Sequence, residues 1–202
     1  MFETDEALVT RFANGDEGAF AALVTKWRDH VLNFGYQFLG NEEMARDVSQ
    51  EVLLRLYLSL KKFRGKAKFS TFLYRIIKNC CIDTHRKNCR NAKEISFDDL
   101  NINDNRENNI PLESTSNPVT ETPLDIVHRE DIGEKVRQAL MELSEDQRMV
   151  IIMKEYSQMR FAEIAHVTGT PESTVKSRMY KGLVNLKKIL YRSGIKDWSD
   201  IE

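Results

Sequence analysis

Two short stretches of the sequence concentrate positively charged side chains, which are suited to bind anionic groups such as phosphates. Residues 61–90 contain ten Lys and Arg against one acidic residue, and residues 171–196 contain seven against one. A local cluster of cations attracts phosphates even where the whole chain is not basic. The two stretches therefore predict two separate contacts with a polyanion.

The remainder of the chain is acidic or nearly neutral. The formal net charge of the 202 residues is -1, which taken alone argues against a nucleic-acid-binding protein. Residues 1–60 contain ten acidic against five basic residues, and residues 91–125 contain eight against two. The average thus conceals a segregated charge pattern, and this pattern keeps a nucleic acid as the expected ligand.

The second basic stretch begins with a pattern typical of a helix-turn-helix. Ile164 and Ala165 lie five and four residues before Gly169, and Val175 lies six residues after it. Such a motif needs a small residue where the helices cross, Gly at the turn and a branched residue that seats the second helix. Thr170-Pro171 is expected to supply the N-cap and the first residue of the second helix.

The second helix of this motif is amphipathic. At 3.6 residues per turn, Thr174, Ser177, Arg178 and Lys181 fall along one side, and the opposite side is apolar. The apolar residues are Val175, Met179, Leu183 and Leu186. We expect one side to pack and the other to meet DNA; the alternative is an ordinary helical hairpin with a solvated basic face.

The apolar spacing elsewhere also predicts helices, so the fold class is all-α. In the first half, helices are expected before Asn14-Gly15, from about residue 16 to Gly40, after Asn41 as N-cap, and over 70–87. In the second half, they are expected over 127–141, after a capping box that opens at Ser144, and over 161–168 and 171–190. The polar, proline-containing stretch 91–125 reads as a flexible acidic linker. The expected division is two small helical domains, 1–90 and 126–192, joined by the linker 91–125 and followed by a tail, 193–202.

The motifs in both halves resemble the extracytoplasmic-function (ECF) sigma factors of the sigma-70 family. Leu143-Ser-Glu-Asp-Gln-Arg148, Phe161-Ala-Glu-Ile-Ala165 and Pro171-Glu-Ser-Thr-Val-Lys-Ser-Arg178 resemble region four. Gly15-Asp-Glu-Gly-Ala-Phe20, Ala45-Arg-Asp-Val-Ser-Gln-Glu51 and the segment 63–76 resemble region two. The resemblance covers nearly the whole chain and implies a subunit that directs core RNA polymerase to promoters and melts the minus-ten element.

The resemblance assigns roles to matching residues. Binding of polymerase falls to Asp47, Gln50, Glu51 and Arg55, for which the alternative is a solvated acidic helix face. The residues expected to contact the minus-ten element are Arg64, Lys66, Lys68, Phe69, Ser70, Thr71, Phe72, Arg75, Lys78, Asn79 and Arg86. The cations among them can follow phosphates, and the rings of Phe69, Phe72 or Tyr74 can stack on unpaired bases. For Phe72, packing in the core is the stronger interpretation. Contact with the minus-thirty-five element falls to Ser173, Thr174, Lys176, Ser177, Arg178, Tyr180 and Lys181.

The expected partners follow from the same resemblance. They are core RNA polymerase, through its clamp coiled coil and flap, promoter DNA, and an anti-sigma factor. We expect a cytoplasmic monomer with no direct membrane insertion. Ser144, Phe72 and Ser173 stand where the family often has Pro, Trp and Gly, which leaves the promoter preference open. The main rival is a helix-turn-helix regulator that senses a signal and dimerises on a palindrome.

No catalytic residue, metal or cofactor is expected, because no paired carboxylates, nucleophile triad or full ligand set stands out. Cys81, His85 and Cys89 are spaced four apart, next to Cys80. Two of these side chains could bind zinc with a partner or sense oxidants, but the outer two lie about 12 Å apart on an ideal helix, too far for one ion. Functionally silent thiols are the expectation.

Overall fold

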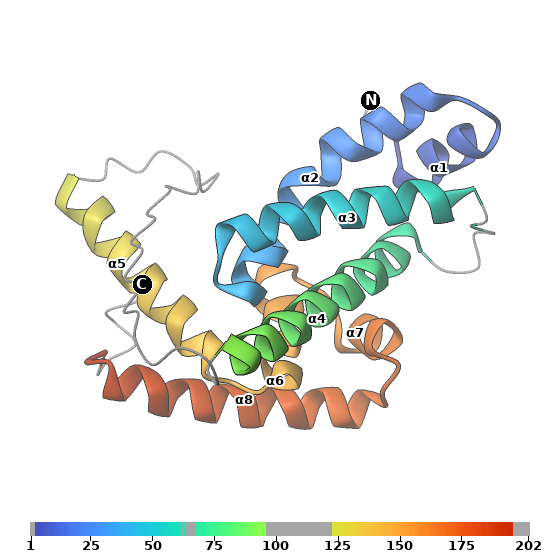
Figure 1. Cartoon of the computed structure of the whole chain (residues 1–202). Coiled ribbons are helices and arrows are strands. Elements are labelled where there is room, and N and C mark those ends of the chain that lie inside the picture. Colours follow the sequence, from blue (N-terminus) through green and yellow to red (C-terminus); the bar gives the residue numbers. More distant parts are fainter. Residues whose placement is uncertain (1–2, 62, 64–67, 96–122, 196–202) are drawn as a thin grey trace.

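The computed structural model describes residues 3–61, 63, 68–95 and 123–195, and all regular structure within these ranges is helical. Figure 1 shows the arrangement of the helices. They are α1 (Asp5–Ala13), α2 (Glu17–Leu39), α3 (Glu42–Leu60), α4 (Phe69–Ile95), α5 (Pro123–Met141), α6 (Glu145–Ile151), a π-helical turn η1 (Ile152–Tyr156), α7 (Phe161–Thr168) and α8 (Glu172–Arg192). The all-α expectation is confirmed.

The N-terminal half is a bundle in which α2, α3 and α4 lie side by side (Figure 1). Gly40 ends α2 in the left-handed conformation at φ 68°, and the side chain of Asn41 accepts a hydrogen bond from Met44 N at 2.9 Å to begin α3. Both caps agree with the sequence prediction. Leu23 and Leu56 are fully or almost fully buried in this bundle and hold its helices together.

The C-terminal half contains the predicted helix-turn-helix in α7 and α8. Gly169 makes the turn at φ 70°, a conformation that favours glycine, and Ile164 and Val175 are completely buried on either side of it. One detail of the prediction is wrong: α8 begins at Glu172, and Pro171 is its N-cap. Because the ψ of Pro171 is extended at 145°, its carbonyl accepts the first hydrogen bonds of the helix without joining it.

The predicted capping box at Ser144 does not form. Ser144 is the N-cap of α6, but its side chain makes no capping hydrogen bond. The amide oxygen of Gln147 instead accepts a hydrogen bond from Asn185 Nδ2 of α8 at 3.2 Å. A tertiary contact between α6 and α8 has replaced the local bond that the sequence pattern indicated.

The boundaries of the central segment also differ from the prediction. Helix α4 continues to Ile95, beyond the expected end at residue 87, and α5 begins at Pro123 rather than at residue 127. Residues 96–122 of the expected linker and residues 196–202 of the expected tail lie outside the described residues. No described helix has the length and apolar character needed to cross a membrane.

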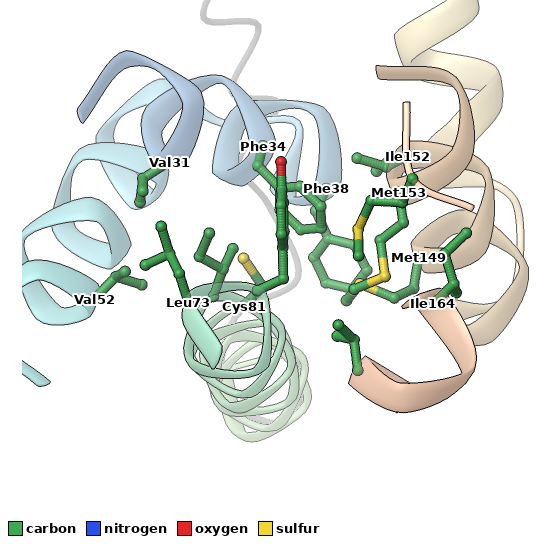
Figure 2. Packing of buried hydrophobic residues seen from close by; sticks show 14 of the residues in the cluster. Val31, Phe34, Phe38, Val52, Leu73, Cys81, Met149, Ile152, Met153 and Ile164 are labelled. Atoms are coloured by element: carbon green, nitrogen blue, oxygen red, sulfur yellow. The ribbon is translucent and has the colours of Figure 1, made fainter. Parts of the chain in front are cut away.

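The buried residues of the two halves form one continuous hydrophobic cluster. Phe34 and Phe38 of α2 point toward Met149, Ile152 and Met153 in Figure 2, and all five side chains are buried. Sharing a core in this way stabilises the contact between the halves through burial of apolar surface. The sequence analysis expected two domains but did not predict that they would pack together.

Candidate nucleic-acid and polymerase interfaces

Five of the seven side chains predicted to read DNA from the helix-turn-helix line one hollow. Eight residues of α8 and of the start of α6 line it: Ser144, Asp146, Gln147, Ser173, Thr174, Ser177, Arg178 and Lys181. The four residues predicted to share one side of α8 are all among them. Lys176 and Tyr180, also predicted to contact DNA, are exposed on the same helix, Tyr180 at 62%. The opposite side packs through Val175, Met179 and Leu186, as predicted.

Two cations of α8 are held by nearby carboxylates. Arg178 Nη2 lies 2.6 Å from Asp146 Oδ2, and Lys176 Nζ lies 2.7 Å from Glu172 Oε1. The hydrogen bond and charge of Glu172 raise the pKa of Lys176 above its ordinary value. Lys181 has no ion-pair partner among the described residues. Arg178 must leave Asp146 to contact DNA, whereas Lys181 is available as it stands.

Gly182 sets how closely α8 approaches α6, and the sequence analysis missed it. A Cβ atom at this position would meet Ile151 Cδ1 at 2.9 Å and Gln147 Cβ at 3.3 Å. A larger residue would therefore require the end of the Ile151 side chain to move and Gln147, which lines the hollow, to shift by a few tenths of an ångström. Its position seven residues after Val175, on the packed side of α8, is the signal that could have identified it.

The residues predicted to contact the minus-ten element differ in exposure. Lys68, Arg75, Asn79 and Arg86 are exposed, Ser70, Phe72 and Lys78 are half-buried, and Phe69 and Thr71 are buried, while Arg64 and Lys66 lie outside the described residues. Burial, followed by the charge of Arg75, lowers the pKa of Lys78. Arg75, Asn79 and Arg86 fall on one side of α4 at helical spacing, and Lys68 directly precedes the helix.

The structure corrects the stacking roles given to Phe69 and Tyr74. Phe69 has 0% exposure, and its ring meets Trp27 edge-on with centroids 5.9 Å apart. Tyr74 is buried against Trp27 and Phe34, and burial raises the pKa of its hydroxyl. Neither ring can stack on a base in this arrangement, because each is needed to fill the core beside α2.

Phe72 is the aromatic ring of α4 that remains partly accessible. It packs against Phe63, with ring centroids 4.8 Å apart and planes inclined by 43°. Both rings are half-buried, so part of the pair faces solvent at the start of α4. Phe63 stood outside the predicted set of contact residues, although it opens the basic loop that leads into this helix.

The residues predicted to bind polymerase share the outer face of α3. Asp47 and Gln50 are exposed. Arg55 forms two ion pairs: its Nε lies 2.5 Å from Glu51 Oε1, and its Nη1 lies 3.7 Å from Asp83 Oδ2 of α4. The hydrogen bond to Glu51 is the main cause of a raised pKa at Arg55. This pairing ties the charged face of α3 to α4.

Two leucines on the same face were missed by the sequence analysis. Leu54 and Leu58 are 55% and 61% exposed. They follow Asp47 and Glu51 at helical spacing, so charged and apolar side chains form one stripe along α3. Because Leu54 and Leu58 fall off the apolar stripe of Val48, Leu56 and Leu60, helical periodicity alone could have identified them. Clustered exposed leucines among charges are typical of a protein-binding surface.

The cysteines and His85 do not converge on one point. Cys80 and Cys81 are buried, and burial raises the pKa of both thiols. Cys89 is exposed, with its Sγ 3.9 Å from His85 Nε2, and His85 Nδ1 lies 3.0 Å from Glu145 Oε1. Within the described residues, no three His, Cys, Asp or Glu side chains are placed to hold a metal ion.

Comparison with known proteins shows the family to which the chain belongs. Residues 23–91 match the family Sigma-70 region 2, and residues 133–186 match the family Sigma-70, region 4. The chain is 30% identical over 182 residues to the ECF RNA polymerase sigma factor SigW of Bacillus subtilis, which covers 90% of this chain and 94% of that protein. It is also 30% identical to the RNA polymerase sigma-H factor of Pseudomonas aeruginosa, over 93% and 94% of the two chains.

Solved structures show the same fold. The structure of CnrH in complex with the cytosolic domain of CnrY matches with a TM-score of 0.68 and 20% identity, over 94% of this chain and 99% of CnrH. The sigma factor RpoE from Bartonella quintana, in complex with the anti-sigma factor NepR, matches with a TM-score of 0.62 and 21% identity, over 85% and 96% of the chains. With the two matched regions and the relatives above, the chain belongs to the ECF RNA polymerase sigma factors, transcription initiation factors that act at specific promoters.

Proposed function

We propose that α8 reads the minus-thirty-five element from the major groove of duplex DNA. The observation that carries this assignment is the hollow between α6 and α8, where Thr174, Ser177, Arg178 and Lys181 converge. Arg and Lys side chains suit guanine edges and phosphates, and Ser and Thr make shorter contacts. The N-terminal half of α8 is exposed on this side, so a groove can reach it without rearrangement of the helix-turn-helix.

Helix α4 and the loop before it hold the minus-ten element in our proposal. Arg75, Lys78 and Arg86 follow the phosphates, and Asn79 offers an amide to a base edge. Phe72, supported by Phe63, takes the stacking role in place of the buried rings. A bipartite reader of this kind couples duplex recognition at one site to capture of melted strand at the other.

The stripe on α3 is the proposed contact with the polymerase clamp coiled coil. It combines Asp47, Gln50, Glu51 and Arg55 with the apolar side chains of Leu54 and Leu58. The charges orient the encounter, and the leucines supply the apolar area that is buried on binding. Region 4, which we define as residues 133–186, is the proposed contact with the polymerase flap.

The remaining assignments follow from the proposed role in transcription initiation. The chain acts as a non-catalytic, cytoplasmic initiation subunit that is monomeric when free. Two structural neighbours were solved with CnrY and with the anti-sigma factor NepR, which supports an anti-sigma factor as a partner here. A dimeric helix-turn-helix regulator would instead bind a palindrome without polymerase.

Run-off transcription with purified core polymerase tests the proposal. Addition of the chain should produce promoter-specific starts that neither component gives alone. Leu54→Asp with Leu58→Asp should abolish these starts while the variant keeps its fold, since both side chains are exposed. A control matched in charge, Ala21→Asp with Ala22→Asp at two exposed positions of α2, should retain activity. Absence of any core-dependent start over a library of genomic promoters would overturn the proposal.

A further inference from the structure

An acidic side chain lies on the surface that is proposed to meet duplex DNA. Among the described residues that line the hollow between α6 and α8, Asp146 is acidic and the others are neutral or basic. DNA presents phosphates and the acceptor atoms of base edges, so a carboxylate on this surface opposes binding through its charge. The sequence analysis did not place Asp146 among the residues that contact DNA, and the proposed function leaves it without a role.

Tertiary packing fixes the position of Asp146 relative to α8. Helices α6 and α8 lie against each other (Figure 1), and Gly182 lets them approach closely because it has no side chain. The hydrogen bond from Asn185 Nδ2 to Gln147 Oε1, at 3.2 Å, holds the residue next to Asp146 against α8. Asp146 also lies in the first turn of α6, where the helix dipole favours a negative charge. The carboxylate is therefore held in a defined place beside α8.

The three cations in the first half of α8 differ in their partners. Arg178 Nη2 lies 2.6 Å from Asp146 Oδ2, and the side chain of Arg178 is 28% exposed. Lys176 pairs with Glu172 of the same helix, whereas no ion-pair partner of Lys181 is seen in the part of the chain that the structure describes. Lys181 can therefore attract the phosphates of any sequence. Arg178 gains from a contact with DNA only where that contact is stronger than the ion pair that it gives up.

A guanine edge is the DNA group best able to draw Arg178 away from Asp146. In the major groove, guanine N7 and O6 accept two hydrogen bonds from one guanidinium, a contact that discriminates between bases by about five- to 150-fold. An exposed ion pair contributes about two- to fivefold to an equilibrium constant. A phosphate only replaces one anion by another, and the other base edges offer one acceptor or none in the same place. Arg178 therefore gains most from leaving Asp146 where it meets guanine.

We propose that Asp146 is a specificity-determining residue, which holds Arg178 away from DNA unless a guanine lies within its reach. This role rests on the proposed function of α8 as the reader of the minus-thirty-five element. At a guanine, Arg178 exchanges the carboxylate for N7 and O6. At any other base pair it stays bound to Asp146, so the wrong sequence gains no contact from this cation. Asp146 thus increases the difference in affinity between right and wrong sequences, although it lowers the affinity for both.

A library of duplexes with a randomised minus-thirty-five element, built on a promoter that gives core-dependent starts, tests this role. Each variant is assembled with core polymerase and mixed with the library, and sequencing of the bound and free duplexes gives the relative affinity for every sequence. Asp146→Asn should reduce the preference for guanine at one base pair by about two- to fivefold, the range expected for an exposed ion pair. Asp146→Glu keeps the negative charge and should retain more of the preference. Glu142→Gln, which removes an exposed carboxylate of region 4 outside the hollow, should leave the preference unchanged.

The same experiment with Arg178→Ala separates the ion pair from the charge of Asp146. Asp146→Asn removes a negative charge near DNA as well as the partner of Arg178, and the loss of charge alone would act on all sequences alike. If Asp146 acts through Arg178, Asp146→Asn should change the base preference of the wild-type chain but not that of the Arg178→Ala variant. Thermal unfolding establishes that all the variants fold.

The possible outcomes distinguish this role from the proposed function. An equal or stronger preference of Asp146→Asn at every base pair would overturn the role of Asp146, and so would an Arg178→Ala variant with the wild-type pattern of preferred bases. A loss of preference that persists in the Arg178→Ala background would show that Asp146 does not act through Arg178, which also overturns the proposal. A wild-type chain without any preference within the minus-thirty-five element would instead refute the proposed function of α8.

Discussion

The two basic helices differ in what their cations face. In α8, Ser173, Ser177 and Lys181 are exposed around a hollow that is open to a ligand. In and directly before α4, the cations Arg75, Arg86 and Lys68 contact negative groups of region 4. Both helices come from stretches of similar positive charge. The difference teaches that clustered charge predicts attraction to a polyanion, whereas the tertiary arrangement decides whether that attraction is satisfied within the chain.

The packing of each helix explains the difference. Helix α8 crosses α6 at Gly182 and buries one side, which leaves its first turns projecting outward. Helix α4 buries Leu73 and Ile77 and also contacts α7. The experiments below test this contrast, from the largest expected effect to the smallest.

Phe38→Ala should lower the free energy of unfolding by about 3 to 5 kcal/mol, the usual cost of removing a buried Phe. The side chain is fully buried between α2 and region 4, so both halves should lose stability together. Urea unfolding followed by Trp fluorescence and by far-UV circular dichroism measures the effect. Leu58→Ala, at an exposed position, should change stability by less than about 0.5 kcal/mol. A separate region 4 transition that is unaffected by Phe38→Ala would show that the halves do not share a core.

Arg148→Met should destabilise the chain by about 1 to 3 kcal/mol, because carbonyl groups of Phe38, Met141 and Leu143 lose a buried donor. Arg148→Lys should recover part of this loss, since an ammonium can still donate to some of them. The same urea experiment measures both variants. Wild-type stability of Arg148→Met would mean that the guanidinium does not hold the halves together.

Arg178→Ala should weaken binding to a promoter duplex by about 1 to 3 kcal/mol and relax specificity at one base pair if the side chain reads guanine. Uniform weakening over all sequences would identify a phosphate contact instead. Asp146→Asn should tighten binding modestly, because it removes the carboxylate that holds Arg178 at 2.6 Å. Electrophoretic mobility shifts with polymerase holoenzyme measure both, and an unchanged promoter response of Arg178→Ala would remove this residue from the site.

Chemical modification of the cysteine thiols should have the smallest effect on transcription, and the exposed and buried thiols should differ clearly in reactivity. Cys89 should react rapidly with a disulfide reagent, whereas Cys80 and Cys81 should react only on unfolding, because they are buried and their raised pKa values keep less thiolate at a given pH. Modification of Cys89 alone should leave transcription unchanged, in keeping with the predicted silent role. Loss of transcription that a Cys89→Ser variant resists would contradict that role.

Much of the fold could be predicted because it depends on neighbours along the chain. The helix ends at Gly40 and Gly169, the cap at Asn41 and the apolar side of α8 all follow from contacts within a few residues. The family was identified from motifs in both halves, and the comparisons confirm it. The exposed pair Leu54 and Leu58 could also have been predicted, since it departs from the buried stripe of its own helix.

Other features depend on contacts between distant residues, which helical spacing does not reveal. Phe69 and Phe72 occupy one helix, yet the first packs against Trp27 and the second against Phe63. The side chain of Gln147 bonds to Asn185 rather than completing a capping box. These contacts could be predicted only with knowledge of which segment packs against each residue.

Composition, charge segregation and local motifs were sufficient to predict two helical regions that bind DNA, because these properties belong to short stretches of chain. Only the folded molecule shows that region 4 lies on α4 and that Arg148 donates to the end of α2. The physical reason is that a cation bonds as readily to a protein carboxylate or carbonyl as to a phosphate oxygen, and the partner it takes depends on which group the fold brings within about 3 Å.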